Sequence, residues 1–518
     1  MNGAHALLST LRANGVDTCF ANPGTSEMHF VAGLDDFTDI RGVLCLFEGV
    51  ATGAADGYAR VTGRPAATLL HLGPGLGNGF ANLHNARRAH VPLLNVIGDH
   101  ATYHARFDAP LQSNIGAIAS ALEGYVTTAS SPDAVAGETA RALSAAYGPP
   151  GQIATLILPA DVSWGDLSSA PASWPSASRP TSSAPSEADV ARAVELMRTK
   201  RTALFVGGDA SDASSLALAK AIADASGAAL IMETFPTIFD HGAGVVTPDR
   251  LIYISEFAQG QLQEFEAMVT IGAIEPVGFF AYPNVPSRLL PDSAEVHVLA
   301  APGIDTTAAL SMLAERFEVR PAAVEAGERP DAPHGTLTTA SLAQAVAATL
   351  PEDVIISDES NTGGVHLYTA LRHAPRHRWM TLTGGSIGMG LPAAVGAALG
   401  SGQRVLALEA DGSMMYTLQA LWTMARESLD VTVVALNNRS YGILNFERQR
   451  VGAVREGAQS NHMLDLDHPG LDLAALARAQ GVPAVTVTSA EDLSAALARS
   501  YATPGPSFIE AVLPAGLS

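Results

Sequence analysis

Two pairs of polar residues near the end of the chain could together hold a metal ion. Asp411-Gly412 and Asn437-Asn438 each follow an apolar segment that we expect to be a strand, and 24 residues lie between the two pairs. Neighbouring parallel strands end at the same edge of a sheet, where such folds bind ligands. Carboxylate, amide and carbonyl oxygens suit Mg²⁺, so the predicted ligands are Asp411, Asn438 and the backbone carbonyl of Ser440.

The same strand ends could receive a diphosphate. Gly412 lets a phosphate approach the backbone closely, and a helix that we expect to begin near Ser413 would point its free N–H groups at an anion. Either dipeptide alone is more often an ordinary turn at the end of a strand. Their joint spacing, after two matching strands, favours the metal and phosphate site.

A single carboxylate stands where an apolar strand gives way to a helix in the first part of the chain. Glu48 follows Leu46-Phe47 and opens a segment rich in alanine and glycine, Gly49–Arg60. A carboxylate in such surroundings can exchange a proton with a bound molecule near neutral pH. The alternative is a carboxylate that only caps the helix.

Two further segments at strand ends carry candidate polar residues. Asn22–Glu27 is expected to form a tight turn that includes Thr25, and His71 ends a strand before the glycine loop Leu72–Asn78. A histidine beside a flexible loop can carry protons. A lone histidine is more often structural, and with 15 histidines in the chain a chance placement is easy.

The elements that would position these residues are short apolar strands alternating with alanine-rich helices. Continuous apolar strands joined by helices are typical of parallel sheets covered on both faces. The expected strands are Ala67–Leu72, Leu93–Ile97, Ile153–Leu158, Leu204–Val206, Val269–Ile271, Val354–Ser357, Val405–Glu409 and Val431–Leu436. The expected helices include Phe80–Ala89, Leu216–Ala225 and Pro392–Leu399.

Two stretches without periodic pattern divide the chain. Residues 168–185 are mostly serine, proline and alanine, and residues 320–335 contain three prolines and two glycines. Such compositions are typical of linkers. We therefore predict three α/β domains, each with a doubly wound parallel sheet. Their predicted limits are 1–166, 188–320 and 338–518, with linkers at 167–187 and 321–337.

The composition argues against several other classes of protein. The 518 residues carry a formal net charge of −21, which disfavours nucleic acids and anionic membranes as partners. No stretch is long and apolar enough to span a membrane. Two cysteines, Cys19 and Cys45, are too few for disulfide bonds to stabilise a chain of this length. Met1–His5 lacks the pattern of a signal peptide. We therefore expect a cytoplasmic protein.

The chain resembles the thiamine-diphosphate-dependent enzymes over nearly its whole length. Asp411-Gly412 and Asn437-Asn438 are similar to the family's signature, Gly-Asp-Gly followed by 24–27 residues and Asn-Asn, except that Ala410 replaces the first glycine. The segment around Glu48 is similar to the family's pyrimidine-binding domain. The resemblance implies a pyrimidine-binding, a central and a diphosphate-binding domain, in that order. It also implies thiamine diphosphate and Mg²⁺ as cofactors.

Within this family the resemblance assigns roles to individual residues. Glu48 would bond the aminopyrimidine ring and so promote loss of the proton from the thiazolium carbon. In the family this glutamate acts across a subunit interface, which implies a homodimer or homotetramer. The residues expected to bind the cofactor are Pro23, Gly24, Glu48, Ile387, Gly412, Ser413, Asn438, Tyr441, Gly442 and Ile443.

Around the expected substrate site, the chain is similar to two branches of the family. Leu70-His71 matches the pair that carries the catalytic histidine of benzoylformate decarboxylases, and Thr25 falls where those enzymes have the serine that binds the substrate carboxylate. Their second active-site histidine falls near Phe280–Tyr282, where this chain has none. Leu111-Gln112 resembles a Phe-Gln pair of acetolactate synthases, which adds Gln112 to the catalytic candidates. The flavin motif of that branch is missing around Gly242–Thr247, so we expect no FAD.

The expected reaction is decarboxylation of a 2-oxo acid by a lyase or transferase. The product would be an aldehyde, or a ligation product if a second carbonyl compound, an aldehyde or a ketone, acts as acceptor. One alternative is an NAD-dependent dehydrogenase, because Gly388–Ala393 fits a dinucleotide fingerprint and Glu409 could bind a ribose. A second alternative is an inactive paralogue that still binds the cofactor.

Overall fold

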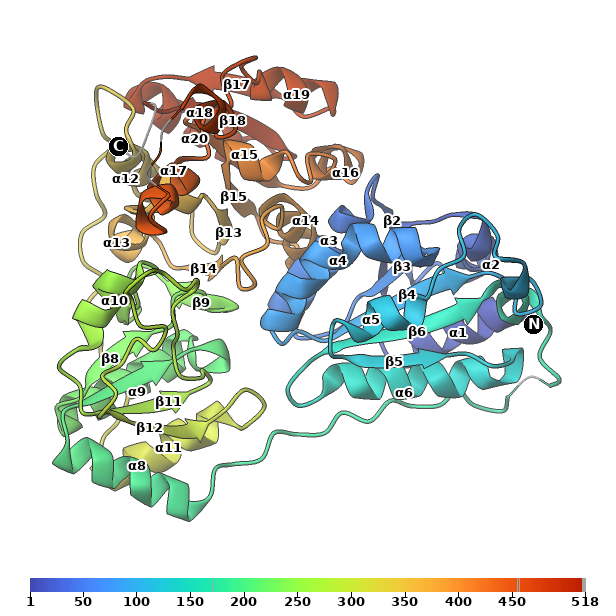
Figure 1. Cartoon of the computed structure of the whole chain (residues 1–518), viewed down its shortest axis with the longest axis horizontal. Coiled ribbons are helices and arrows are strands. Elements are labelled where there is room, and N and C mark those ends of the chain that lie inside the picture. Colours follow the sequence, from blue (N-terminus) through green and yellow to red (C-terminus); the bar gives the residue numbers. More distant parts are fainter. Residues whose placement is uncertain (170, 454, 456, 515–518) are drawn as a thin grey trace.

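The chain folds into three α/β units, each built around its own sheet (Figure 1). The structure is a computed structural model and describes residues 1–169, 171–453, 455 and 457–514. Residues 171–186 run as an extended chain from the first unit to the second (Figure 1). Three doubly wound α/β sheets agree with the predicted fold class, whereas the predicted domain limits stay predictions. Within the described residues, no helix has the length and apolar character needed to cross a bilayer.

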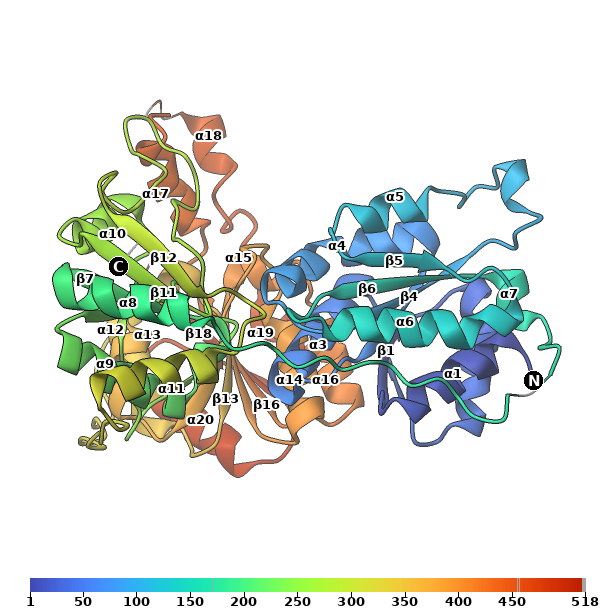
Figure 2. The same ribbon diagram turned by 90° about the horizontal axis from the view of Figure 1, so that it is seen from below.

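The first sheet has six parallel strands in the order β2-β1-β3-β4-β6-β5. Helices α5 and α6 lie on opposite faces of it (Figure 2). The strands are β1 (Thr18–Asn22), β2 (Arg41–Leu44), β3 (Ala67–His71), β4 (Leu93–Asp99), β5 (Tyr125–Thr128) and β6 (Ile153–Pro159). The helices are α1 (Gly3–Ala13), α2 (Met28–Gly33), α3 (Glu48–Thr62), α4 (Leu72–Arg88), α5 (Ile115–Ser120), α6 (Val135–Tyr147) and α7 (Ala160–Trp164).

The second sheet has five parallel strands in the order β10-β8-β7-β11-β12. Its strands are β7 (Thr202–Val206), β8 (Ala229–Met232), β10 (Asp249–Arg250), β11 (Ala267–Ile271) and β12 (Glu295–Ala300). Its helices are α8 (Glu187–Thr199), α9 (Ala213–Ser226), α10 (Ser255–Leu262) and α11 (Thr306–Phe317).

The third sheet has the order β17-β18-β16-β15-β13-β14-β9. All its pairs are parallel except the edge pair, in which β9 (Ile238–His241) from the middle of the chain runs antiparallel to β14. The other strands are β13 (Ile355–Glu359), β14 (His377–Met380), β15 (Val405–Ala410), β16 (Val431–Asn437), β17 (Ala484–Val487) and β18 (Ser507–Val512). The helices are α12 (Thr339–Thr349), α13 (Leu367–Ala370), α14 (Gly390–Ser401), α15 (Asp411–Met414), α16 (Ala420–Arg426), α17 (Gly442–Arg450), α18 (Ala458–His462), α19 (Leu473–Ala479) and α20 (Ala490–Ala502).

Helix α3 of the first unit packs directly against α14 of the third unit (Figure 1). Glycines allow this close approach, because a Cβ at Gly57 would lie 2.1 Å from the carbonyl oxygen of Ala393 and one at Gly396 would lie 1.8 Å from that of Ala54. A single buried apolar cluster continues through both helices and both sheets. A Cβ at Gly53 would contact Pro392 and one at Gly400 would contact Thr62, so the two helices run in the same direction and their starts lie at the same end of the pair.

Candidate active site

The carboxyl ends of β15 and β16 meet at the carboxylate of Asp411. Asp411 is 3% exposed, and its two oxygens accept the backbone N–H groups of Gly412 at 2.8 Å and Arg439 at 2.6 Å. Because Arg439 directly follows Asn438, the two polar pairs seen in the sequence lie side by side. Burial raises the pKa of Asp411, and the neighbouring backbone N–H groups oppose that rise.

The surroundings of Asp411 fit a cation and a phosphate. The side-chain oxygen of Asn438 accepts the N–H of Ser440 at 3.1 Å, which holds this turn beside the carboxylate. A Cβ at Gly412 would lie 2.5 Å from Cε1 of Tyr441, so only glycine leaves this space open. Oxygen ligands of this kind suit Mg²⁺. The helix here differs from the prediction, since α15 begins at Asp411 rather than near Ser413 and ends at Met414.

The remaining predicted cofactor residues on this side begin helix α17. Tyr441 precedes the helix, and Gly442 and Ile443 are its first two residues. The backbone N–H of Tyr441 donates to the carbonyl of Leu464 at 3.0 Å, which fixes the start of α17 beside the turn at Asn438. Ser413 receives a hydrogen bond of 2.9 Å from the side chain of Asn361.

Glu48 is the first residue of α3 and is 7% exposed. Its Oε2 accepts a hydrogen bond of 3.0 Å from Nδ2 of Asn78 on α4. A Cβ at Gly75 would lie 3.3 Å from the other oxygen, Oε1, so glycine at this position gives that oxygen room. The carboxylate is thus held at one oxygen in a buried setting, as a proton-exchanging group requires.

The predicted glycine loop after His71 is wrong, because α4 begins at Leu72 and runs to Arg88. Several of its glycines, unlike Gly77, serve close packing rather than flexibility. A Cβ at Gly73 would lie 1.9 Å from Oγ of Ser113, and one at Gly79 would lie 2.7 Å from Cγ2 of Thr52. The helix can therefore approach α3 and the loop before α5 only because these positions lack side chains.

His71, the last residue of β3, is oriented by a buried carboxylate. Its Nδ1 lies 2.8 Å from Oε2 of Glu27, which is 2% exposed and also accepts the N–H of Gly24 at 2.7 Å. A Cβ at Gly24 would lie 2.3 Å from Nδ1, so a side chain there would displace the ring. Burial raises the pKa of Glu27, and the neighbouring His71 opposes that rise.

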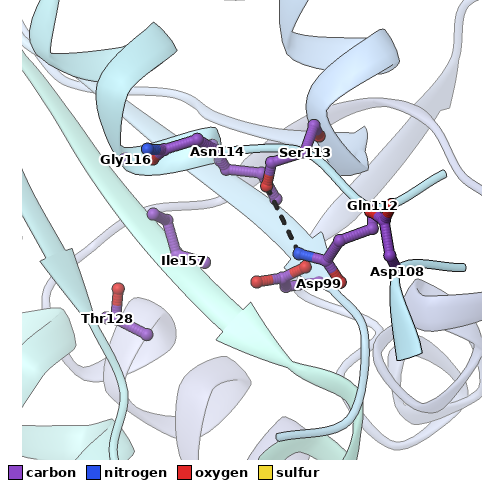
Figure 3. Close-up of a pocket in the computed structure, with 9 residues that line it drawn as sticks. Asp99, Asp108, Gln112, Ser113, Asn114, Gly116, Thr128 and Ile157 are labelled. Carbon is purple, nitrogen blue, oxygen red and sulfur yellow. Dashed lines mark hydrogen bonds between the residues drawn. The ribbon is translucent and has the colours of Figure 1, made fainter. Parts of the chain in front are cut away.

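The other predicted residues of the substrate site lie in two places. Thr25 is exposed and begins the short 3₁₀ helix Thr25–Glu27, directly after Pro23-Gly24. Gln112 lines an open pocket of about 550 Å³ beyond the ends of β4 and β5, where its Nε2 lies 3.5 Å from the carbonyl of Ser113 (Figure 3). The pocket is lined by Asp99, Asp108, Gln112, Ser113, Asn114, Ile115, Gly116, Thr128 and Ile157.

Ile387 lies in the segment that leads into α14. It is half-buried and packs against the apolar cluster shared by the first and third units. The carbonyl of the next residue, Gly388, accepts a hydrogen bond of 3.0 Å from Oγ1 of Thr417. The segment is thereby fixed to the loop that follows α15.

Sequence reasoning missed two polar residues of this site, Glu27 and Asn78. Glu27 is recognisable only when β1 and β3 are known to be neighbours, because 44 residues separate it from its partner His71. A signal for Asn78 was present, since asparagines recur at 78, 82 and 85, a spacing that places side chains on one face of a helix. Because residues 72–78 were expected to form a loop, this helical spacing of asparagines was not recognised.

Comparisons with known proteins identify the family of this chain. Residues 1–120 match the family described as "Thiamine pyrophosphate enzyme, N-terminal TPP binding domain". Residues 361–511 match "Thiamine pyrophosphate enzyme, C-terminal TPP binding domain". The first match contains Glu48 and His71, and the second contains Asp411 and Asn438. Fold and site together define a thiamine-diphosphate-dependent enzyme.

Relatives of similar length support the same conclusion. The chain is 52% identical to a Mycobacterium tuberculosis protein provisionally named as an acetolactate synthase large subunit, with 99% of each chain covered. It is 32% identical to benzoylformate decarboxylase of Pseudomonas aeruginosa, with 96% of each covered. The fold matches 4-hydroxybenzoylformate decarboxylase of Rhodococcus jostii with a TM-score of 0.82, at 24% identity and with 100% of each chain covered. The chain belongs to the thiamine pyrophosphate enzyme family of decarboxylases and carboligases, as the sequence predicts.

Neither alternative is supported by these comparisons, and the dehydrogenase also conflicts with the structure. Glu409, the residue expected to bind a ribose, is 0% exposed. A Cβ at Gly390 would lie 2.0 Å from its Oε1, so the fingerprint segment covers this carboxyl group directly. Burial and the adjacent Glu359 raise the pKa of Glu409, which opposes the charged form that would bind a ribose.

Proposed function

We propose that this enzyme uses thiamine diphosphate and Mg²⁺ to decarboxylate a 2-oxo acid. The observation that carries the proposal is the setting of Glu48, a buried carboxylate at a helix start with one oxygen held by Asn78 and the other beside Gly75. Glu48 would exchange a proton with the aminopyrimidine ring. Asp411, Asn438 and the carbonyl of Ser440 would hold Mg²⁺ and, through it, the diphosphate.

When bound, thiamine diphosphate supplies a nucleophilic carbon and accepts the electrons that the departing CO₂ leaves behind. Side chains of the protein donate and accept the protons. Glu27 holds Nδ1 of His71, which leaves Nε2 to exchange a proton with the substrate carbon or oxygen. Thr25, exposed two residues before Glu27, would bind the substrate carboxylate. Delivery of a proton by His71 releases an aldehyde.

Ligation is the second candidate outcome, and the 52% identity to a protein provisionally named as an acetolactate synthase large subunit favours it. In that case an acceptor aldehyde or ketone would replace the proton. Gln112 and its pocket at the edge of the first sheet would contact the acceptor. We also propose that the enzyme acts in the cytoplasm as a homodimer or homotetramer.

A panel of 2-oxo acids tests the proposal. The enzyme is incubated with each acid, thiamine diphosphate and Mg²⁺, with and without acceptor aldehydes or ketones, and CO₂ and organic products are quantified. CO₂ release with an aldehyde product supports protonation, and CO₂ release only with an acceptor supports ligation. Absence of CO₂ release from every acid, by protein that binds the cofactor, would refute the proposal.

A further inference from the structure

A buried carboxylate on β18 contacts the turn that carries two of the predicted metal ligands. Glu510 is 5% exposed, and its Oε1 accepts a hydrogen bond of 2.7 Å from Nδ2 of Asn437, the last residue of β16. The strands β16 and β18 are neighbours in the third sheet. Glu510 therefore holds the first of the two adjacent asparagines, whereas the predicted ligand is the second, Asn438.

The amide of Asn437 connects Glu510 to the backbone of this turn. Its Oδ1 accepts the N–H of Arg439 at 3.2 Å, and the same N–H donates to Oδ2 of Asp411 at 2.6 Å. Turning the amide over would place its NH₂ group against the N–H of Arg439 and its oxygen against the carboxylate of Glu510. Only the observed orientation satisfies both neighbours, so Glu510 fixes the direction in which this amide points.

The turn depends on such support because Arg439 has an unfavourable backbone conformation. Its φ is +59°, in the left-handed region that residues with a Cβ rarely adopt. Two side-chain oxygens hold its N–H in place. Asn438 and Ser440 stand on either side of Arg439 in the chain, so a change of its φ would move both predicted ligands.

The other oxygen of Glu510 is held by groups outside the turn. Oε2 accepts a hydrogen bond of 2.9 Å from Oγ1 of Thr486 on β17 and one of 3.3 Å from the N–H of Ala474 on α19. Donors from three different elements thus surround one carboxylate. Its position is fixed by the packing of the third unit, and the turn is held against it.

We propose that Glu510 is a positioning residue for the Mg²⁺ site. Through Asn437 it holds the turn that presents Asn438 and the carbonyl of Ser440 to the metal. The inference rests on the proposed function, which places Mg²⁺ between these ligands and Asp411. All of these groups belong to the third unit of one chain, so the contact is the same whichever subunit supplies the activating glutamate. Loss of a partner one contact away from a metal ion typically lowers metal affinity by roughly 10–100-fold.

Hydrogen exchange in the cofactor-free protein tests whether Glu510 holds the turn. Glu510→Ala removes all three bonds, whereas Glu510→Gln keeps an oxygen that can accept from Asn437. We expect amide exchange in a peptide covering residues 437–442 to accelerate by roughly tenfold or more in Glu510→Ala and by less in Glu510→Gln. The matched control is Thr432→Val near the other end of β16, because Thr432 is 1% exposed and its Oγ1 lies 2.6 Å from Oγ of Ser500. That variant should leave exchange in residues 437–442 unchanged.

Calorimetry on the same preparations measures the consequence for the metal. With thiamine diphosphate in excess, the apparent affinity for Mg²⁺ should fall by roughly 10–100-fold in Glu510→Ala, by less in Glu510→Gln, and not at all in Thr432→Val. A purely structural role would lower the melting temperature of the variants without changing the Mg²⁺ affinity of the folded protein. Wild-type exchange or wild-type Mg²⁺ affinity in both Glu510 variants, or equal losses in Thr432→Val, would overturn the inference. If the wild type shows no Mg²⁺-dependent binding of thiamine diphosphate, the proposed function fails, and faster exchange in Glu510→Ala still shows that Glu510 holds the turn.

Discussion

Nδ1 of His71 lies 2.8 Å from Oε2 of Glu27, and the same oxygen accepts the N–H of Gly24 at 2.7 Å. β1 and β3 are neighbours in the first sheet, which brings the turn after β1 to the histidine at the end of β3. A carboxylate at Nδ1 keeps the proton on that nitrogen and directs Nε2 outward. The pair therefore has the arrangement of an oriented proton carrier.

Removal of either member of this pair should slow turnover. We expect His71→Ala to lose roughly a hundredfold in kcat and Glu27→Gln to lose roughly tenfold, because the second change disturbs only the orientation of the ring. Cofactor affinity should survive in both. Single-turnover rates and melting temperatures are measured on one preparation of each variant. A variant that melts much earlier but turns over normally would show that the pair serves packing alone.

Two glycines of α4 should respond differently to the same substitution. Gly75→Ala places a Cβ 3.3 Å from Oε1 of Glu48, whereas no atom lies within 4 Å of a Cβ at Gly77. Alanine favours a helix over glycine by about 0.5–1 kcal/mol, so neither variant should melt earlier than wild type. We expect a loss of roughly tenfold in kcat for Gly75→Ala and normal kcat for Gly77→Ala. Equal kcat in the two variants would argue against a catalytic role for the space beside Glu48.

Calorimetry should identify the cofactor. Asp411→Ala removes the carboxylate that joins the ends of β15 and β16, and we expect Mg²⁺-dependent binding of thiamine diphosphate to disappear. Wild-type protein should bind thiamine diphosphate with Mg²⁺ and should show no heat of binding with NAD. If Asp411→Ala bound thiamine diphosphate with wild-type affinity, Asp411 would not be a ligand of the metal ion.

Acid should weaken the edge of the third sheet. His377 on β14 is 1% exposed, burial lowers its pKa to about 4, and its Nδ1 lies 2.7 Å from the carbonyl of Pro375. A lowered histidine pKa stabilises the folded protein above the ordinary value of 6.5, and that contribution is lost as the pH falls from there towards 4. Wild type should therefore melt earlier at pH 5 than at pH 7, and His377→Phe should show a smaller difference. The exposed His334→Phe serves as control, and an equal pH dependence in all three proteins would contradict this assignment.

Sequence patterns located the main strands because the strands are continuous apolar runs. β15 and β16 begin at the predicted residues and end one residue later than predicted, so the polar pairs after them could be assigned to one sheet edge. The contact between Asp411 and Arg439 follows from that topology. Glu48 was placed at a helix start for the same reason, since an apolar strand ended just before it.

Contacts that depend on two distant segments could not be predicted in the same way. The glycines of α4 predict a loop because glycine disfavours helices. In the structure, packing against Glu48, Thr52 and Ser113 outweighs that preference. The bond of Asn82 to Gly388 joins residues 306 positions apart. β9 is a four-residue strand that leaves its own unit to pair with β14, and no local pattern specifies such a partner.

The most direct test of the central claim is the rate of CO₂ release by Glu48→Gln compared with wild type. Both proteins are saturated with thiamine diphosphate and Mg²⁺, and binding of the cofactor is confirmed by calorimetry. Glutamine keeps the size of the side chain and a hydrogen bond to Asn78 but cannot exchange a proton. We predict that cofactor binding persists while CO₂ release falls by about a hundredfold or more. A rate within about tenfold of wild type would contradict the role of Glu48 and with it the proposed chemistry.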